Sequence, residues 1–261
     1  MSTRVIAEPV PSPSLGRAIY AIARRELRKA LREPASLIPA VTIPLFFFFV
    51  QTAALSGLTD QAGFPNYEAF VLPASVLFAT ANEGAGLSLV MDIDRGYFDK
   101  LLLAPVHRVS LVLGAMSANV VRVAAQAAIV TFIAMATGLT FQTGVIGAFG
   151  MIGLGVLWGI AYAGFGIAIA LKTGSPSATQ ASFVLFFPFL FLTTTFAPKE
   201  VLAGWFKVAV SLNPVTYLLE AMRGFSLTGD FSDIGKGLLA VAILGAISMT
   251  LALRALRSRA G

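Results

Sequence analysis

The stretch VAAQAAIVTFIAMATGLTFQTGVIGAFGMIGLGVLWGIAYAGFGIAIAL, residues 123–171, runs for 49 positions without a charged residue. A helix needs about 20 mostly apolar residues to cross roughly 30 Å of hydrocarbon, so this stretch is too long for a single span. The turn-prone segment TGLTFQTGVIG, residues 137–147, divides it. The pattern therefore predicts two membrane helices, at about 111–137 and about 145–171.

The composition of the whole chain agrees with a membrane protein. Of its 261 residues 57% are apolar and 12% charged, and the mean hydropathy is +0.82, whereas soluble domains have about 45–50% apolar and about 25% charged residues. These values exclude a water-soluble single-core protein, a disordered chain and a collagen-like chain. The chain has no Cys, and His107 is its single His. We therefore expect no disulfide and no metal site.

Four more apolar segments lie outside this stretch, at about 36–55, 70–90, 178–195 and 234–253. The predicted fold class is thus all-α and integral to the membrane, with six transmembrane helices. The segments that would lie on one side carry fourteen Lys and Arg residues, and those on the other side carry four. Because cytoplasmic loops are enriched in Lys and Arg, both termini are predicted to be cytoplasmic.

The segment before the first span divides into two parts. Residues 1–14 are rich in Pro and Ser and are predicted to be disordered, whereas residues 15–33 have apolar residues at three- and four-residue spacing opposite a basic face. Such a helix lies in the cytoplasmic membrane interface, with its cations towards anionic headgroups. Two roles fit this helix: an anchor that fixes the topology of the chain in the membrane, or a lever that connects a cytosolic partner to the first span. The anchor is favoured. Residues 34–261 would form the six-helix domain.

The largest predicted cytoplasmic loop is MDIDRGYFDKLLLAPVHR, residues 91–108. Its short aromatic and Leu-rich run contains one acidic and one basic residue and ends at Pro105. Exposed apolar groups with a charged rim suggest a docking site for another protein. A loop that tucks back into the lipid headgroups explains the same pattern equally well.

Residues 197–230, between the fifth and sixth spans, are too charged to span the membrane and too apolar for a free loop. We expect one or two short helices that dip into the outer leaflet and are interrupted at Asn213 and Pro214. Trp205, Phe206 and Tyr217 are side chains that suit the interface. Glu220 and Arg223, three residues apart, can pair on one helix face.

Two ionisable residues, Glu83 and Arg122, fall inside predicted spans. Such groups are costly in a membrane and are functional candidates by default. A structural ion pair between them is favoured over substrate recognition. Of the 21 Phe residues, nine lie in Phe-rich runs in the first and fifth spans, where packing or lipid contact is favoured over a role in lining a substrate path.

Three stretches together resemble the ABC type-2 permease family, in particular its daunorubicin-resistance-type exporters. They are DRGYFDKLLLAPVHR (94–108), NPVTYLLEAMRG (213–224) and the basic amphipathic helix before the first span. Asp99 departs from the family pattern, in which Glu is more usual. The matching residues are Asp94, Arg95, Gly96, Phe98, Asp99, Leu101, Leu102 and Pro105 in the first stretch, and Asn213, Pro214, Tyr217, Glu220 and Arg223 in the second.

The resemblance implies a permease subunit that works with a separate ABC ATPase, present in two copies, and with a second permease chain, identical or paralogous. Residues 94–105 would be the coupling helix in a groove of the ATPase, and ATP-driven closure would alternate access for a drug or lipid-like substrate. The chain has no G-x-x-x-x-G-K-[ST] sequence. ATP and Mg are therefore expected on the partner, with no cofactor and no catalytic residue in this chain. The implied location is a bacterial-type plasma membrane, among lipids and without nucleic acid.

Three other functions compete with this interpretation. An ion-coupled secondary transporter would use Glu83 and Arg122 as a charge relay and would show inverted repeats; residues 36–137 and 145–253 show no such repeat. An intramembrane enzyme would need a metal cluster, an Asp pair or a Ser beside a buried His, which the predicted spans lack. A structural assembly protein without transport activity stays open.

Overall fold

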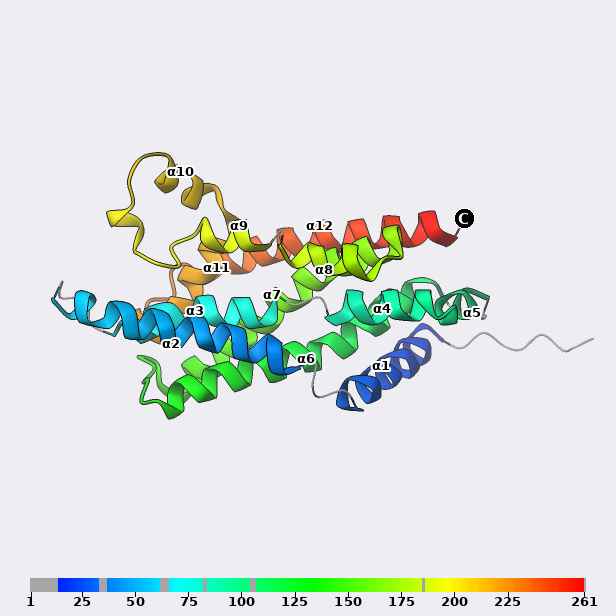
Figure 1. Cartoon of the computed structure of the whole chain (residues 1–261), viewed down its shortest axis with the longest axis horizontal. Coiled ribbons are helices and arrows are strands. Elements are labelled where there is room, and N and C mark those ends of the chain that lie inside the picture. The colour runs from blue at the N-terminus through cyan, green and yellow to red at the C-terminus, as the bar shows by residue number, and fades with distance from the viewer. Residues whose placement is uncertain are drawn as a thin grey trace, which may run out of the picture.

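The computed structural model describes residues 14–32, 37–61, 66–81, 84–103, 107–184 and 186–260. Throughout this part of the chain the regular elements are helices, arranged as an elongated bundle (Figure 1), which confirms the predicted all-α class. In chain order they are α1 (Leu15–Arg32), α2 (Leu37–Gln61), α3 (Tyr67–Thr80), α4 (Gly84–Asp94), α5 (Tyr97–Leu103), α6 (Val109–Ala136), α7 (Gly144–Thr173), α8 (Pro176–Val184), α9 (Phe186–Phe191), η2 (Lys199–Val201), α10 (Gly204–Leu212), α11 (Pro214–Arg223), the π-helical η3 (Gly224–Thr228) and α12 (Ile234–Ala260).

Five helical segments of the described chain are long and apolar enough to cross a membrane. They are Leu37–Leu55, Tyr67–Asp94, Val109–Ala136, Gly144–Thr173 and Ile234–Arg259. The second consists of α3 and α4, and Glu83, which follows α3 in the sequence, lies outside the described residues. These segments coincide with five of the six predicted spans.

The fifth predicted span, residues 178–195, is shorter than expected. It consists of α8 and α9, and the backbone leaves the helix after Phe191. Thr193 and Thr195 explain this end, because their hydroxyls donate to the carbonyl oxygen of Leu190 at 2.5 and 3.1 Å. Threonine hydroxyls that bond nearby backbone groups in this way compete with the helical hydrogen bonds.

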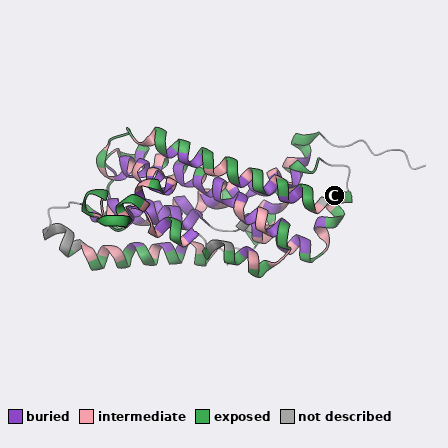
Figure 2. Cartoon of the chain, turned by 90° about the horizontal axis from the view of Figure 1, so that it is seen from above, coloured by how far each residue is buried: buried purple, intermediate pink, exposed green. Residues whose placement is uncertain are grey.

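The core runs along the middle of the bundle (Figure 2), and α7 lies at its centre, packed against α12, α6, α4 and α3. Small residues allow these helices to approach closely. A Cβ atom added to Gly86 on α4 would lie 2.6 Å from the backbone carbonyl of Gly166 on α7. At the crossing of α7 and α12, a Cβ on Gly164 would lie 2.5 Å from the hydroxyl oxygen of Ser248.

Two helices at the margin of the bundle expose much of their apolar surface. On α2 the exposed side chains are Ile38, Ile43, Phe46, Phe47, Phe49 and Val50, and on α12 they include Leu238, Leu239, Ile243, Ile247 and Leu251. An apolar surface of this extent suits contact with hydrocarbon or with another protein rather than with water.

Helix α1 packs against α6 at one end of the bundle, where Ile22 fills the space beside Gly114. The same end carries α5 and the C-terminal part of α12, whereas α10 lies at the opposite end (Figure 1). These two ends are named the α5 end and the α10 end below. They hold the two groups of residues that the sequence singled out.

Candidate functional site

The loop predicted at residues 91–108 contains a short helix, α5, within residues 94–105, where the family resemblance implied a coupling helix. Its residues divide into two faces. Asp94, Arg95, Asp99, Lys100 and Leu103 are exposed, Leu103 at 87%; Leu101 and Leu102 are half-buried. Gly96 turns the chain from α4 into α5 with a φ of 67°, and Pro105 lies outside the described residues.

The expectation that Phe98 is exposed to the cytosol is wrong. Its side chain is 1% exposed and lines a small pocket together with Ile22 of α1, Leu89 of α4 and Leu111 of α6. The sequence of α5 is too short to show which face turns inward, and α1 supplies the apolar partner for that face. Phe98 therefore holds α5 to the bundle instead of meeting a partner.

A group of charges that the sequence analysis did not single out joins α1 to α4. Arg25 donates from both terminal nitrogens to the two carboxylate oxygens of Asp92, at 2.6 and 2.9 Å, in the bidentate geometry typical of strong Arg–carboxylate pairs. The guanidinium carbon also lies 4.0 Å from the ring centroid of Tyr97. The hydrogen bond that Arg25 donates to Asp92 raises the pKa of Arg25 above its ordinary value, so Arg25 is charged at neutral pH.

Glu26 extends this group of charges. Ser88 donates to its carboxylate at 2.5 Å, and Lys29 donates to the Ser88 hydroxyl at 2.9 Å. Glu26 is the single acidic residue of the otherwise basic α1; that isolated acid was a signal of a polar contact, although the sequence does not show which helix supplies the partner. Phe98 of α5 lines one small pocket together with Glu26 of α1 and Asp92 of α4. Helices α1, α4 and α5 therefore form one connected unit.

At the α10 end, Asn213 and Pro214 interrupt the chain between α10 and α11, as predicted. Asn213 caps α11 by accepting from the backbone N–H of Val215 at 3.0 Å, and Pro214 occupies the first helical position. The Asn213 amide also donates to the carbonyls of Phe189 and Leu192, at 2.6 and 2.8 Å. Asn213 thus attaches the end of α9 to α11.

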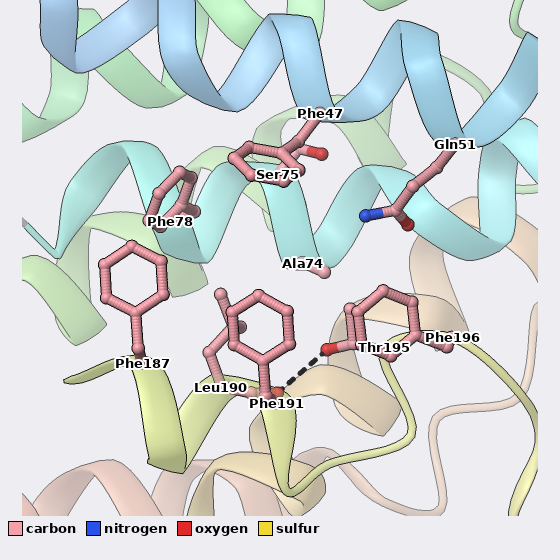
Figure 3. A pocket seen from close by; sticks show the side chains of 10 residues that line it. All are labelled: Phe47, Gln51, Ala74, Ser75, Phe78, Phe187, Leu190, Phe191, Thr195 and Phe196. Atoms are coloured by element: carbon pink, nitrogen blue, oxygen red, sulfur yellow. Dashed lines mark hydrogen bonds between the residues drawn. The ribbon is translucent and has the colours of Figure 1, made fainter.

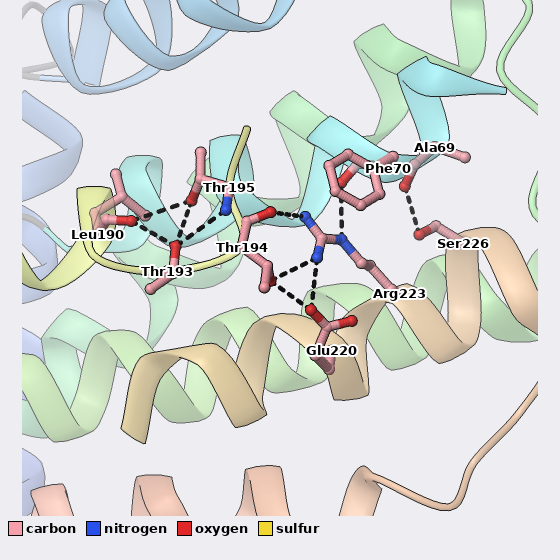
Figure 4. A network of polar contacts seen from close by, with 9 residues as sticks. All are labelled: Ala69, Phe70, Leu190, Thr193, Thr194, Thr195, Glu220, Arg223 and Ser226. Carbon is pink, nitrogen blue, oxygen red and sulfur yellow. Dashed lines mark hydrogen bonds and ion pairs between the residues drawn. The ribbon is translucent and has the colours of Figure 1, made fainter. Parts of the chain in front are cut away.

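The predicted Glu220–Arg223 pair is present, at 2.7 Å, and belongs to a larger network (Figure 4). Arg223 is 3% exposed and donates to the carbonyls of Phe70 and Thr194, at 3.2 and 2.6 Å, and to the Thr194 hydroxyl at 2.7 Å. The Thr194 hydroxyl in turn donates to Glu220. The guanidinium carbon lies 3.5 Å from the centroid of the Phe70 ring. One buried cation therefore connects α3, the segment after α9, and α11.

A polar cavity of about 290 Å³ adjoins this network. Arg223, Glu220 and Tyr217 line it, so three of the five residues predicted from the second stretch meet at one cavity. Its remaining walls come from Phe70, Thr194, Pro198, Lys199, Glu200, Ser211, Thr216, Asp233 and Lys236.

A second pocket, of about 30 Å³, lies between α2, α3 and α9 (Figure 3). Phe78 stands between Phe47 and Phe187, with ring centroids 5.7 and 5.4 Å away. Gln51 and Thr195 add polar groups to its wall. The volume is that of about one water molecule, so in this conformation the Phe-rich segments mainly pack against one another.

The remaining intramembrane candidates are not brought together in the described residues. Arg122 is half-buried on α6, and Glu83, its predicted partner, lies outside those residues. The ion pair between them stays a prediction.

The family model described as "ABC-2 type transporter" matches residues 17–226, from α1 into η3. The chain belongs to the ABC-2 type transporter family. This membership, together with the apolar helices, makes it a multi-pass membrane protein and a transmembrane ABC transporter subunit rather than an ATPase.

Curated relatives match over most of the chain. The daunorubicin resistance ABC transporter permease protein DrrB1 of Streptomyces coeruleorubidus is 26% identical over 230 residues, 87% of this chain and 81% of that protein. The probable doxorubicin resistance ABC transporter permease protein DrrC of Mycobacterium tuberculosis is 26% identical over 207 residues, 78% of this chain and 75% of that protein. The putative transport permease ycf38 of Pyropia yezoensis is 26% identical and covers 81% of this chain and 75% of its own length.

Proposed function

We propose that this ABC-2 permease is one half of the membrane pathway of an ATP-driven exporter. It would pair with a second permease chain, identical or paralogous, and the pair would bind two copies of a separate ATPase subunit. Six spans result when α8, α9 and the residues after them count as the fifth. The α5 end and both termini then face the cytoplasm of a bacterial-type cell, and the α10 end faces outward.

The observation that carries the proposal is the orientation of α5. Its inner face is fixed by Phe98, whereas Asp99, Lys100 and Leu103 point away from the bundle. A short helix that is firmly held and presents both charge and one large apolar side chain suits docking to another protein. ATP and Mg would bind to that partner.

The unit of α1, α4 and α5 supplies a route from this docking site to the spans. The Arg25–Asp92 pair and the Arg25–Tyr97 contact tie α1 to the last turn of α4 and to the start of α5. A displacement of α5 by the ATPase would therefore move α4 and α1 together. These contacts support a role for α1 as a lever that transmits motion, in addition to its role as an anchor in the membrane interface.

For the cargo we propose a hydrophobic or amphipathic compound, drug-like or lipid-like, moved by alternating access. Two printed relative names refer to daunorubicin and doxorubicin resistance. The pocket between α2, α3 and α9 offers aromatic rings beside Gln51 and Thr195, which suits contact by apolar area with a few polar groups. In this proposal the pocket widens when the cytoplasmic side opens.

Copurification tests the coupling role. The tagged chain is extracted in mild detergent, and its partners are identified and quantified by mass spectrometry. We expect a P-loop ATPase near one copy per permease chain, and we expect Leu103→Glu to remove it while leaving the melting temperature of the permease unchanged. Leu212→Glu makes the same substitution at the exposed α10 end and should keep the ATPase. Retention of the ATPase by Leu103→Glu would show that α5 is not the docking helix.

A further inference from the structure

Helix α12 presents a continuous apolar stripe to the outside of the bundle. The exposed side chains of this stripe recur every four residues, at Leu239, Ile243, Ile247 and Leu251. The opposite face fixes the orientation of the helix, because Ser248 is fully buried at the crossing with Gly164 of α7. At 1.5 Å per residue the stripe is about 18 Å long. Half of the hydrocarbon core of a bilayer is about 15 Å thick, so the stripe is long enough to carry one acyl chain.

The same face of α12 ends in two arginines. Arg254 and Arg257 follow Leu251 at three-residue intervals, so together with the stripe they occupy about one third of the helix circumference. Both are exposed, and neither has a hydrogen bond or an ion pair within the described residues. Side chains three residues apart on a helix are neighbours, and the guanidinium fork suits phosphate oxygens. The two arginines can therefore hold one phosphate between them.

The helices around the two arginines bring no acidic side chain to them. Helix α12 packs against α7, α6 and α11; α12, α7 and α6 contain no Asp or Glu, and α11 lies towards the α10 end (Figure 1). On the side of α7 there are two further cations, the exposed Lys172 and Arg259, which donates to the carbonyl of Leu171 at 3.1 Å. The acidic residues of the α5 end lie on α1, α4 and α5: Glu26, Asp92, Asp94 and Asp99. The charge at the end of the stripe is therefore positive.

We infer that this face of α12 binds an anionic phospholipid. The phosphate lies between Arg254 and Arg257, and an acyl chain lies along the stripe from Leu251 towards Leu239. A zwitterionic headgroup brings its own cation to the same arginines, so a headgroup with a net negative charge is preferred. In the proposed topology the lipid belongs to the cytoplasmic leaflet, which is the leaflet with the negative surface potential. The lipid is a resident of the protein surface and is distinct from the proposed cargo.

Lipid binding is measured on the purified chain without an ATPase subunit, so a failure of the proposed coupling does not affect the result. Native mass spectrometry in detergent gives the affinities for phosphatidylglycerol and for phosphatidylcholine with the same acyl chains. The wild type should prefer phosphatidylglycerol about twentyfold. Arg254→Gln and Arg257→Gln should each weaken phosphatidylglycerol binding about fivefold, the effect of one basic residue near an anionic headgroup. The double variant should bind the two lipids equally.

The matched control is Lys207→Gln combined with Lys236→Gln. It also removes two exposed cations, but at the α10 end, and should keep the preference for phosphatidylglycerol. Because Arg254 and Arg257 are exposed and unpaired in the described chain, their variants should melt in phosphatidylcholine at the temperature of the wild type. Glycerol 3-phosphate, a phosphate without acyl chains, should not displace the lipid, since the stripe supplies apolar contact that only a chain can use.

Three results overturn the inference. The first is equal affinity of the wild type for the two lipids. The second is an equal loss of phosphatidylglycerol binding in the control variant, because attraction by the net charge of the chain would then explain the preference. The third is a double Arg254→Gln, Arg257→Gln variant that keeps the lipid but no longer copurifies with an ATPase. The two arginines would then contact an acidic protein surface instead of a phospholipid.

Discussion

The hydroxyl of Ser226 donates to the carbonyl oxygen of Ala69, 2.7 Å away and 157 positions earlier in the chain (Figure 4). Ala69 precedes Pro73 by four residues, and in an α-helix its carbonyl would accept from the backbone N–H at that position. Proline has no such hydrogen. Ser226 therefore replaces the missing donor, and α3 continues through Pro73 without an unsatisfied carbonyl in an apolar environment.

This relationship predicts the outcome of a double-mutant cycle. Ser226→Ala leaves the Ala69 carbonyl without a donor and should destabilise the protein by about 1–3 kcal/mol. In a Pro73→Ala background the helix supplies its own N–H, so the same substitution should cost much less. The free energy of unfolding in mixed micelles measures both. Equal costs in the two backgrounds would contradict the link between Ser226 and Pro73.

The Arg223 network should be far more sensitive to substitution than the other ion pair of the α10 end. Arg223→Gln removes the guanidinium that donates to Glu220, Thr194 and Phe70. Breaking a buried ion pair of this kind costs about 3–5 kcal/mol. Lys236→Gln breaks a pair of the same spacing whose Lys side chain is 64% exposed, and should leave the stability almost unchanged. The melting temperatures of the two variants, measured by thermal unfolding in the same detergent, test this expectation. Similar melting temperatures would show that the network carries little stability.

The sequence was sufficient to place most of the helices. Hydropathy over a window the length of a span depends on many residues at once, so single irregular positions do not disturb it, and the predicted 145–171 became Gly144–Thr173. The interruption at Asn213 and Pro214 was also predictable, because a capping side chain followed by Pro is a local signal. The fifth span was overestimated because the hydroxyls of Thr193 and Thr195 compete with the helix backbone, an effect that hydropathy does not report.

The sites were predictable only where both partners lie on one helix. Glu220 and Arg223 are three residues apart, so helical periodicity reveals their pairing, whereas Arg25 and Asp92 are 67 positions apart. Nothing in the local pattern of α1 shows that α4 brings a carboxylate to Arg25. The inward orientation of Phe98 was missed for the same reason, since it depends on Ile22 and Leu111.

The Arg25–Asp92 pair should affect coupling more than folding. Because Arg25 is about one-third exposed, we expect Asp92→Asn to cost only about 1 kcal/mol of stability. The raised pKa of Arg25 keeps its guanidinium charged, so the contribution of Arg25 to stability is complete at neutral pH and is lost as the pH rises through that pKa. Substrate-stimulated ATPase activity of the reconstituted complex should nevertheless fall several-fold, because α1 would no longer be tied to α4.

The matched variant for that assay is Arg25→Gln. If the pair acts as a unit, Arg25→Gln combined with Asp92→Asn should lower the ATPase stimulation no further than either substitution alone. Additive losses would show that the two residues act independently. Basal ATPase activity, measured without substrate, separates a coupling defect from loss of the ATPase subunit.

The crossing of α4 and α7 should not tolerate even one added methyl group. In Gly86→Ala the new Cβ would lie 2.6 Å from the carbonyl carbon and oxygen of Gly166, and neither is the end of a flexible side chain. The helices must separate, at a cost of about 1–3 kcal/mol for overpacking. Gly153→Ala, on the exposed face of α7 with nothing within 4 Å of the new Cβ, should be neutral or stabilise by up to about 1 kcal/mol. The two variants differ in packing alone, so equal melting temperatures in detergent would show that α4 and α7 do not cross at Gly86.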